Sequence, residues 1–485
     1  MAKITTIIDI GSNSMRMVVL KKTSRFAFHL INESKSKVKI SEGCYENNGN
    51  LQPIPMQRAF EALKSFLKIA KNLQSRKILC VATSALRDAP NKKEFLNRVS
   101  QELKLNIKVI DGKKEAYYGG VATSNLIDCD NFTTVDIGGG STEFAFVENG
   151  TIVNTVSLDI GTVRIQELYL NKNDIAGAKN HIISQLQSIE EKMPTIVGLG
   201  GSARALSRII MKNDAYPLEI LHGFEYDAKE KIPFFRSIIE ANSNKELKKL
   251  GVAKDRYDTI ASGTIIFKMI VKYFEVQKVI TSAVGVREGV YLTDLLRTSN
   301  YKFPENFNVS IRSLLDRFIA DQSQSAYLGN NARNIFNVLE PLHNLDSKYR
   351  SILIIASKLE RIGTSLNFDK NEDNSFLYIL NGLSYGFTHQ DKLLIAMITK
   401  FTKKNLPKRK DIEVYESLLP NIEIIQWLNF MMTLNISLNC EYTKTKYEYT
   451  LHNATLHIKS SQVQYLVNRA LAKIKSPIEL TLDYT

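Results

Sequence analysis

The segments DIGSNSMRMVV, at residues 9–19, and DIGGGSTEFAF, at residues 136–146, repeat one pattern 127 residues apart. In each copy an apolar run of β-forming residues ends in an aspartate, a turn of glycine and small hydroxylic residues follows, and a second apolar run begins. This pattern predicts a β-hairpin with a tight tip. Because the pattern occurs twice, the sequence indicates two half-domains built on one plan.

The segments around these copies alternate between helix and strand patterns. Before the second copy, apolar residues at helical spacing over 60–70 are followed by two short apolar runs that are typical of buried strands, at 78–82 and 107–110. After it, the patterns predict a strand at 151–157 and two helices at 162–171 and 176–191. A strand, a glycine turn and the start of a helix follow at 197–206, and a further helix follows at 256–274. Alternating strands and helices favour an α/β fold.

The periodicity changes at about residue 300. From there long helical patterns prevail, and an alternating, β-like stretch follows near 440–460. A chain of 485 residues is also too long for one hydrophobic core. We therefore predict two α/β domains, at 1–125 and 126–298, and a helical domain with a small β-rich tail at 299–485.

Charge and composition narrow the functional classes. Lys and Arg outnumber Asp and Glu by 64 to 50, which gives a net charge of +14 and predicts affinity for polyanions without naming one. Nucleic-acid binding, or a basic surface with no partner, would give the same excess. The four scattered cysteines, the absence of a signal segment and the absence of a long apolar run predict a cytoplasmic protein without a membrane partner.

Three glycine-rich turns would let backbone N–H groups approach phosphate oxygens closely. One such turn alone is often only a turn, but two facing hairpins with a third glycine pair can enclose a chain of phosphates. The candidate phosphate-binding residues are Gly11, Ser12, Asn13 and Ser14 in the first turn, Gly138, Gly139, Gly140 and Ser141 in the second, and Gly200, Gly201 and Ser202 in the third.

Carboxylates next to these turns are candidates for metal binding. Asp9, Asp136 and Glu143 could hold Mg²⁺, which prefers one or two carboxylates together with phosphate oxygens and water. A strand-end aspartate that only binds its own turn is the simpler alternative. Two further residues have open roles: Arg87 is a phosphate ligand or a surface arginine, and Glu115 is a general base or a charge that suits a helix N-terminus.

Seven segments together resemble the exopolyphosphatase and guanosine pentaphosphate phosphohydrolase (Ppx/GppA) family. They occur in order over the first 295 residues or so, as DIGSNSMRMVV, ATSALRDAPN, DGKKEA, DIGGGSTE, GTVRIQELY, VGLGGSARAL and VGVREGVYL. The resemblance implies two ribonuclease H-like domains of the actin, sugar-kinase and chaperone ATPase superfamily, which flank a cleft. It also implies a homodimer and Mg²⁺ as cofactor.

The resemblance also implies roles for individual residues. Glu115 matches the catalytic base, and Asp136 and Glu143 match acids near the metal and the attacking water. Arg87 and the three glycine turns match phosphate-binding positions, and Arg164 and Arg287 match family positions of less defined role. We therefore expect Glu115, Asp136 and Glu143 to be catalytic, with Asp9 among the substrate-binding residues.

The C-terminal part resembles the HD-like helical domain of long family members. Glu360 and Arg361 stand where a metal-dependent HD enzyme would have His and Asp, and the seven histidines form no cluster in the sequence. We therefore expect this domain to serve substrate binding or dimerisation. A basic run could extend a polyanion track or simply be a solvated loop, and it comprises Lys403, Lys404, Lys408, Arg409 and Lys410.

These observations predict a phosphoanhydride hydrolase that acts on inorganic polyphosphate or converts pppGpp to ppGpp. The sequence does not decide between the two substrates, because both present a terminal phosphoanhydride to the same turns. Two alternatives stay open, an ATP-dependent kinase of the same superfamily and a noncatalytic protein that binds polyanions or RNA. A dedicated nucleic-acid partner is not expected.

Overall fold

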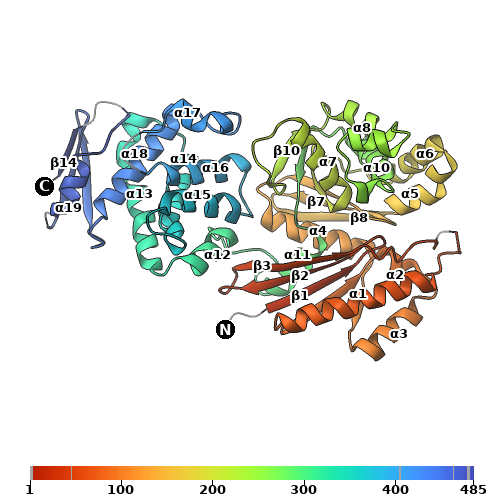
Figure 1. The fold of residues 1–485 in the computed structure, drawn as a ribbon. Coiled ribbons are helices and arrows are strands. Elements are labelled where there is room, and N and C mark those ends of the chain that lie inside the picture. Colours follow the sequence, from red (N-terminus) through yellow and green to blue (C-terminus); the bar gives the residue numbers. More distant parts are fainter. Residues whose placement is uncertain (1–3, 45, 403–405, 463, 478–480, 485) are drawn as a thin grey trace. The chain divides into compact units, whose positions relative to one another are not determined.

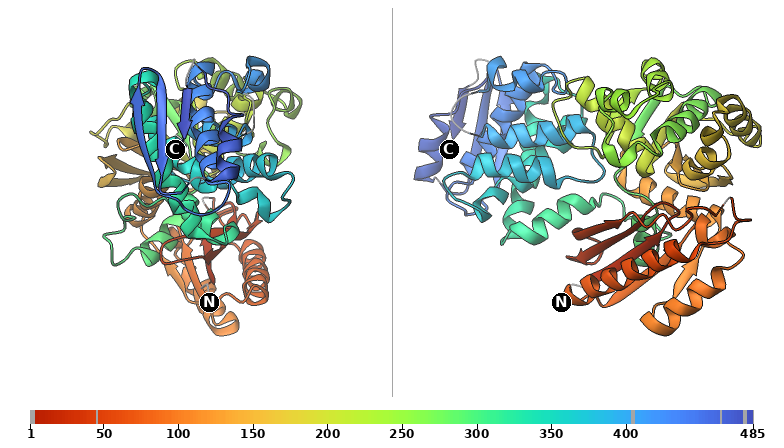
Figure 2. Two further views of the ribbon diagram at one scale, coloured as in Figure 1. Left: turned by 90° about the vertical axis from the view of Figure 1, so that its left-hand side faces the viewer. Right: turned by 45° about the vertical axis from the view of Figure 1, so that its right-hand side comes forward.

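The structure is a computed structural model that describes residues 4–44, 46–402, 406–462, 464–477 and 481–484. It divides into two compact units, Met1–Phe307 and Asn308–Thr485 (Figures 1 and 2). The first unit holds two α/β halves, and the second is mainly helical.

The first half is built on a five-stranded sheet with the order β3-β2-β1-β4-β5. Strands β1, β2 and β3 are antiparallel neighbours, whereas β4 and β5 run parallel to β1. The strands are β1 (Ile4–Ile10), β2 (Met15–Lys22), β3 (Phe28–Ser36), β4 (Lys77–Ala82) and β5 (Ile107–Val109), and the helices are α1 (Pro53–Asn72), α2 (Ser84–Asp88), α3 (Lys92–Leu103) and α4 (Gly112–Leu126). The apolar stripe of α1 includes Phe60, Leu63 and Phe66 and packs in one core with residues of β1 and β2.

The second half repeats this order with one added strand, as β10-β11-β9-β6-β7-β8. Again three antiparallel strands are followed by parallel ones, β9 and β11. The strands are β6 (Phe132–Ile137), β7 (Thr142–Glu148), β8 (Thr151–Leu158), β9 (Thr195–Leu199), β10 (Phe224–Asp227) and β11 (Lys278–Thr281). The shared order confirms the predicted fold class of two ribonuclease H-like halves, and the β1–β2 and β6–β7 pairs confirm the two predicted hairpins.

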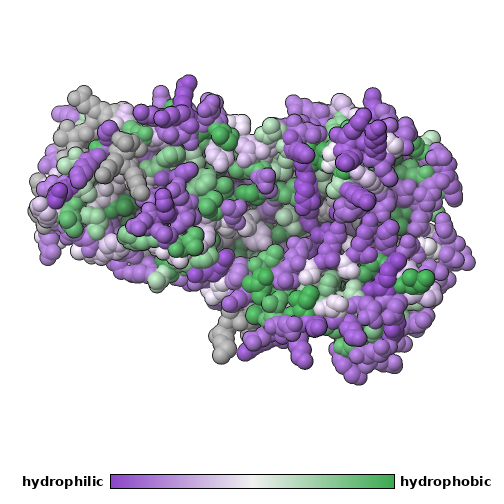
Figure 3. Space-filling model, viewed as in Figure 1, coloured by the Kyte–Doolittle hydropathy of each residue, from purple (hydrophilic) through white to green (hydrophobic). Residues whose placement is uncertain are grey.

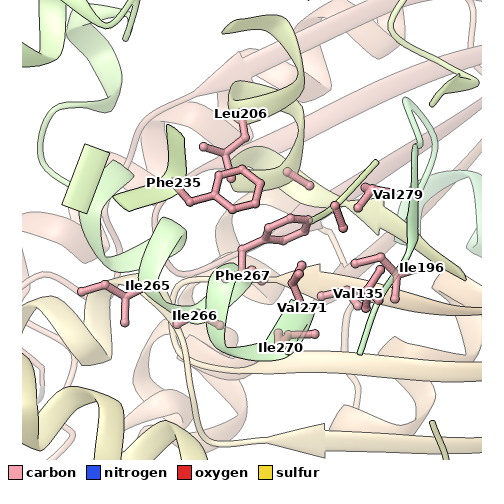
Figure 4. Close-up of a cluster of buried hydrophobic side chains, with 14 of the residues drawn as sticks. Val135, Ile196, Leu206, Phe235, Ile265, Ile266, Phe267, Ile270, Val271 and Val279 are labelled. Atoms are coloured by element: carbon pink, nitrogen blue, oxygen red, sulfur yellow. The ribbon is translucent and has the colours of Figure 1, made fainter. Parts of the chain in front are cut away.

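The helices of the second half surround a large aromatic and aliphatic core. They are α5 (Thr162–Leu168), α6 (Ile175–Leu186), α7 (Gly200–Asn213), α8 (Ile232–Ile239), α9 (Asn244–Lys249), α10 (Ile260–Tyr273) and α11 (Val286–Leu295). Figure 4 shows how Phe267 of α10 and Phe235 of α8 meet edge to face above Val135 and Ile196 of the sheet. Hydrophilic side chains cover the outer helices α6 and α8 in the face that Figure 3 shows.

Two helices connect the halves. Helix α4 follows the last strand of the first sheet but packs against β7 and β8 of the second sheet, while α11 follows β11 of the second sheet and packs against β1 and α4. Figure 1 shows both helices between the two sheets. Each half therefore contributes a helix to the other, and residues near the N-termini of α4 and α11 are brought to the facing hairpins.

The second unit is a helical domain with a small three-stranded sheet, as the sequence predicts. Its helices are α12 (Val309–Phe318), α13 (Gln322–His343), α14 (Lys348–Leu359), α15 (Asn371–Gly382), α16 (His389–Lys400), α17 (Arg409–Ile412), α18 (Ile422–Leu438) and α19 (Tyr465–Leu471), and its strands are β12 (Tyr447–His452), β13 (Thr455–Ser460) and β14 (Thr481–Tyr484). A buried polar network joins α13, α14 and α18, in which Asn435 binds Asn331, Ser357 and the carbonyl of Leu328. The hydroxyl of Tyr449 ties the hairpin to the same Asn331.

Some predicted boundaries differ from those observed. The helix predicted from residue 256 begins at Ile260, because residues 254–256 form a separate 3₁₀ turn (Lys254–Arg256). The helix predicted over 162–171 ends at Leu168 and is followed by another 3₁₀ turn (Leu170–Lys172). Among the described residues, no helix is long and apolar enough to cross a membrane.

Candidate functional site

The tips of the two hairpins meet in the first unit. A Cβ atom on Gly139 would lie 2.6 Å from the Cβ of Ser12, so the second tip can approach the first this closely only with glycine at that position. The Ser12 hydroxyl is also 2.9 Å from that of Ser84 at the start of α2. The two copies of the repeated motif therefore face each other, as the sequence suggests.

A cavity of about 150 Å³ lies at this meeting point. It brings together most of the residues that the sequence singles out, from all three glycine turns and from both halves. Its lining includes Asp9, Gly11, Ser12, Asn13, Ser14, Glu115, Asp136, Gly138, Gly139, Ser141, Gly200, Gly201, Ser202 and Arg287. The other four, Arg87, Gly140, Glu143 and Arg164, do not line it and instead contact residues around it.

Strand register arranges the charged residues in two rows across the sheets. On the first sheet Asp9, Arg16 and Lys35 are direct neighbours on β1, β2 and β3, and we call them the first row. On the second sheet Asp136, Glu143 and Ser157 are neighbours on β6, β7 and β8, and we call them the second row. Directly paired residues point to the same face of a sheet, so each row presents its side chains together.

Glu115 is buried on the first turn of α4, as the sequence predicts. Asp111 caps this helix by accepting a hydrogen bond from the N–H of Lys114. Burial, and after it the Glu143 carboxylate, raises the pKa of Glu115 well above its usual value, against the effect of Arg87. A carboxylate with a raised pKa can accept a proton near neutral pH, as a general base requires.

Arg87 connects Glu115 to the second hairpin. Its Nη1 donates to Glu115 Oε2 at 3.1 Å, and its Nη2 donates to Ser141 Oγ at 3.3 Å. Arg87 lies on α2 of the first half, so this pair of bonds crosses from one half to the other. The guanidinium therefore orients the buried carboxylate beside the glycine turn of the second hairpin.

The carboxylates of the second row are also held in a buried setting. Glu143 is 2% exposed, and its Oε1 accepts a hydrogen bond from Ser157 Oγ at 2.9 Å. Burial raises the pKa of Glu143 to about 8 and also raises the pKa of its neighbour Asp136. Gly200 has a φ of +73°, and a Cβ atom there would lie 2.3 Å from Asp136 Oδ1, so this turn needs glycine for both its backbone and its space.

These acids fit a magnesium ion that is completed by substrate. Asp9 Oδ1 is buried without a hydrogen-bond partner, and Asp136 and Glu143 stand directly opposite each other on neighbouring strands. Within the described part of the chain, no three His, Cys, Asp or Glu side chains are placed to hold a metal by themselves. Mg²⁺ commonly takes one or two carboxylates and leaves its other positions to phosphate oxygens and water, so this donor set suits it.

A group of arginines faces the acids. Arg204 is buried, and its guanidinium donates to the carbonyls of Ser282 and Val284 at 2.7 and 3.2 Å. Burial, together with Arg287 and Arg16, lowers its pKa to about 10. A phosphate group beside these cations would accept hydrogen bonds from them and add counter-charge. Helix α7, of 14 residues, also begins at Gly200 with no side-chain cap, which leaves its first N–H groups available to an anion.

The two remaining predicted residues, Arg164 and Arg287, contact the second hairpin tip and line the cavity, respectively. Arg164 Nε donates to the carbonyl of Gly140 at 2.9 Å and pairs with Asp159, so it supports the second hairpin tip. Arg287 lines the cavity from α11 and binds Glu33 Oε1 at 3.0 Å.

Sequence reasoning missed several cations of the cavity, which are Arg16, Lys35, Lys37, Arg204 and Arg256. Two of them lie in motifs already identified in the sequence. Arg16 lies inside the first copy of the repeated motif, at the position equivalent to Glu143, and Arg204 lies inside the VGLGGSARAL segment. Lys35, Lys37 and Arg256 have no such signal, because only strand register and tertiary packing bring them to the cavity.

In the second unit, Glu360 and Arg361 follow the end of α14. Burial raises the pKa of Glu360 to about 7, and the carbonyl of Glu360 accepts hydrogen bonds from Asn371 and Ser375. Of the basic run, Lys403 and Lys404 lie outside the described residues, and Lys408, Arg409 and Lys410 are exposed at the start of α17.

Comparison with known proteins extends these observations. Residues 18–298 match the model of the Ppx/GppA phosphatase family, and residues 308–477 match the model of Ppx/GppA phosphatase, domain III. A bifunctional 3-dehydroquinate synthase/phosphatase of Fusobacterium nucleatum is 33% identical in an alignment of 295 residues, which covers 57% of this chain and 44% of that protein. The chain thus spans less than half the length of this relative.

Solved structures are similar to this chain over about three fifths of its length. The Ppx/GppA family member of Aquifex aeolicus is 27% identical and has a TM-score of 0.52, over 62% of this chain and 99% of that chain. An exopolyphosphatase of Cytophaga hutchinsonii has a TM-score of 0.56 over 60% of this chain and 98% of its own, and at 20% identity it shows the fold alone. The matches confirm the resemblance that the sequence motifs indicated.

Proposed function

The chain belongs to the Ppx/GppA phosphatase family, and we propose that it hydrolyses the terminal phosphoanhydride of inorganic polyphosphate or of a guanosine polyphosphate such as pppGpp. The observation that carries this proposal is the buried Glu115, which Arg87 holds beside the glycine turns and the acids of the second row. A proton acceptor, an anion-binding turn and a pair of acids in one cavity are the groups that phosphoanhydride hydrolysis needs.

In the proposed reaction Glu115 is the general base. It takes a proton from water as the water oxygen attacks the terminal phosphorus, and the bond from that phosphorus to the bridging oxygen breaks. The shortened phosphate chain leaves with the electron pair of that bond. Arg87 supports this role because its bond to Glu115 Oε2 fixes the carboxylate at the wall of the cavity.

The phosphate groups are bound by backbone and by cations. The turns at Gly11, Gly138 and Gly200 offer N–H groups, and Arg16, Arg204 and Arg287 offer guanidinium groups at the same cavity. Because these donors are fixed before substrate arrives, little reorganisation is needed to stabilise charge as it develops on the phosphate oxygens.

We further propose Asp136 and Glu143 as the residues that hold Mg²⁺, with Asp9 nearby. When bound, the ion would neutralise phosphate charge. A homodimer, a cytoplasmic location and the absence of a dedicated nucleic-acid partner complete the proposal, and they stay predictions from the family resemblance and the composition. Size-exclusion chromatography with light scattering would test the dimer.

The central test is phosphate release by purified protein in Mg²⁺, with long-chain polyphosphate and pppGpp as parallel substrates. Glu115→Gln should lower kcat by about 10²- to 10⁴-fold and leave substrate binding in place, because an amide cannot accept the proton. The matched control is Glu94→Gln, an exposed glutamate in the first turn of α3. Wild-type turnover in Glu115→Gln would contradict its role, and the ratio of the two kcat/KM values would name the substrate.

A further inference from the structure

An ionic contact joins the two halves at the rim of the catalytic cavity. From the first half, Lys37 Nζ lies 2.9 Å from Asp258 Oδ2 and donates to the carbonyl of Asp255 at 3.1 Å. Lys39 Nζ lies 3.1 Å from the same Asp258 oxygen, and Lys35 Nζ lies 3.8 Å from Asp255 Oδ2. Lys35 is the last residue but one of β3, and the other two lysines follow that strand. Both acids lie in the segment just before α10 of the second half.

This contact includes part of the cavity wall. Lys35, Lys37, Asp255 and Arg256 all line the cavity, whereas Lys39 and Asp258 line a neighbouring one of about 170 Å³. Lys35 is also the last member of the first row, two strands away from Asp9, which at ordinary strand spacing is about 10 Å. The lysines therefore stand beyond the position of the terminal phosphate, on the path that the rest of a phosphate chain would take.

The cations at this rim outweigh the acids that contact them. Burial, and after it Arg256 and Arg16, lowers the pKa of Lys35, against the weaker effect of Asp255. Arg256 in turn rests on a phosphate-binding turn, since a Cβ atom on Gly201 would lie 2.7 Å from its Nη1. An anion at this place would contact cations of both halves.

We propose that Lys35, Lys37 and Arg256 form a subsite for the phosphates that follow the terminal one in the substrate chain. When no substrate is bound, Asp255 and Asp258 pair with the lysines of this subsite. The proposal rests on the proposed function, and the ligand it names is a linear chain of phosphates, either inorganic or attached to a nucleoside. Such a chain displaces the carboxylates and takes over their lysine partners. A pyrophosphate ion is too short to do so.

The exchange links substrate length to the contact between the halves. A chain that reaches Lys37 separates it from Asp258, so long substrates loosen the rim and short ones leave it closed. Because both partners are about one third exposed, each ion pair is weak and salt-dependent, which makes it easy to exchange. Long chains are therefore favoured over short ones in binding, and this preference falls as salt rises.

The experiment measures binding of pyrophosphate, tripolyphosphate, long-chain polyphosphate and pppGpp by calorimetry, in Mg²⁺ and in full-length protein with Glu115→Gln. Lys37→Gln should weaken long-chain binding about fivefold and reduce the slope of log K against log salt by about one. Asp258→Asn should tighten the same binding about two- to fivefold, because the competitor is removed. Neither change should alter pyrophosphate binding.

Two matched variants make the test specific. Lys39→Gln breaks a contact to the same aspartate from outside the catalytic cavity, so it should not weaken binding as Lys37→Gln does. Asp214→Asn removes a surface acid that pairs with Lys231 at 2.7 Å and carries the same change in net charge, so it should have no effect. Equal effects of Lys37→Gln and Lys39→Gln, or of Asp258→Asn and Asp214→Asn, would overturn the subsite, as would equal effects on pyrophosphate.

The ligand arms identify the source of the phosphate chain. If Lys37→Gln weakens binding of polyphosphate alone, the ligand of the subsite is an inorganic chain, and if it weakens binding of pppGpp alone, the ligand is the nucleotide. Weaker binding of both supports a subsite that the two ligands share. Phosphate release by the protein without the Glu115 change is measured separately. Release with no variant effect on binding would reject the subsite and keep the hydrolase, whereas the binding pattern without release would keep the subsite and reject the hydrolase.

Discussion

The two rows show how one duplicated framework carries two different chemistries. In both halves an aspartate, Asp9 or Asp136, is the last residue but one of the first strand, and the residue opposite on the second strand is charged. At that equivalent position, however, the first half has Arg16 and the second has Glu143. The next neighbour differs as well, since Lys35 ends the first row and Ser157 ends the second.

The two rows also differ in how far their side chains are exposed to solvent. Glu143 is 2% exposed and its carboxylate has a raised pKa, whereas the side chains of Arg16 and Lys35 are 20% and 36% exposed at the rim. A buried acid row suits metal binding and water activation, while a cationic row that opens to solvent suits capture of an anionic substrate. The duplication thus preserved backbone geometry and divided the charges between the halves.

The largest expected effect comes from removing the charge that distinguishes the second row. Glu143→Gln keeps the size of the side chain, and we expect kcat for polyphosphate to fall about 10³-fold because the acid pair with Asp136 is lost. Binding of tripolyphosphate without Mg²⁺ should be unchanged, since Glu143 is proposed to contact the ion and not the phosphate chain. Steady-state kinetics and calorimetry test both outcomes.

Glu148→Gln is the control for this variant, because Glu148 ends the same strand β7 but is exposed. If Glu143→Gln raised KM and left kcat unchanged, the second row would bind substrate as the first does, and the division of roles would be wrong.

The equivalent change in the first row should affect binding more than turnover. Arg16→Met removes a cation that lines the cavity and that pairs with Glu33 at 3.5 Å. We expect KM for polyphosphate to rise about 10- to 100-fold, the range for a hydrogen bond to a charged group, with kcat changed less than threefold or so. Arg98→Met is a control, since Arg98 is a partly exposed residue of α3 that pairs with Glu102 and does not line the cavity. A fall in kcat with constant KM would assign Arg16 to the chemical step.

The rows also show what the sequence can predict. The repeated motif predicts both hairpins, and the position of Glu115 after an expected strand predicts its place on the first turn of a helix. Lys35 could not be found in this way, because it has no motif and is placed only by the register of β3 on β2. The exchange of α4 and α11 between the halves was also out of reach, since periodicity shows that a helix is amphipathic but not which sheet it covers.

Glu360, a buried acid of the second unit that belongs to neither row, shows how burial changes the pKa of a carboxyl group. Burial raises the pKa of Glu360 from a usual value of 4.5 to about 7, so between these pH values the folded protein holds this proton more tightly than the unfolded chain does. By linkage, the stabilisation from this group is complete below about pH 4.5 and is lost as the pH rises through about 7.

Glu360→Gln, which cannot ionise, should therefore stabilise the second unit by about 1 to 3 kcal/mol at pH 8 and have little effect at pH 4.5. Trp427 is the chain's single tryptophan and lies in α18 of the same unit, so its fluorescence follows urea unfolding there. Glu448→Gln, at an exposed position of β12, is the control. Equal stabilisation at both pH values would show that packing, and not titration, is responsible.

The smallest effect should come from the last member of the second row. Ser157 Oγ donates to Glu143 Oε1 at 2.9 Å, and Ser157→Ala would remove this bond while leaving the carboxylate in place. A Cβ atom on Gly112 would lie 2.2 Å from the same Oγ, so the first turn of α4 packs directly on this serine. The hydroxyl thus positions Glu143 and contacts the helix that carries Glu115.

We expect kcat/KM to fall about three- to tenfold, which is the range of an ordinary net hydrogen bond, because the carboxylate keeps its other contacts. Ser157→Thr restores a hydroxyl but adds a methyl group against Gly112, so it should not recover activity, whereas full recovery would show that the hydroxyl alone matters. If Ser157→Ala were as active as the wild type, only the two acids of the second row would contribute to catalysis, and Ser157 would not.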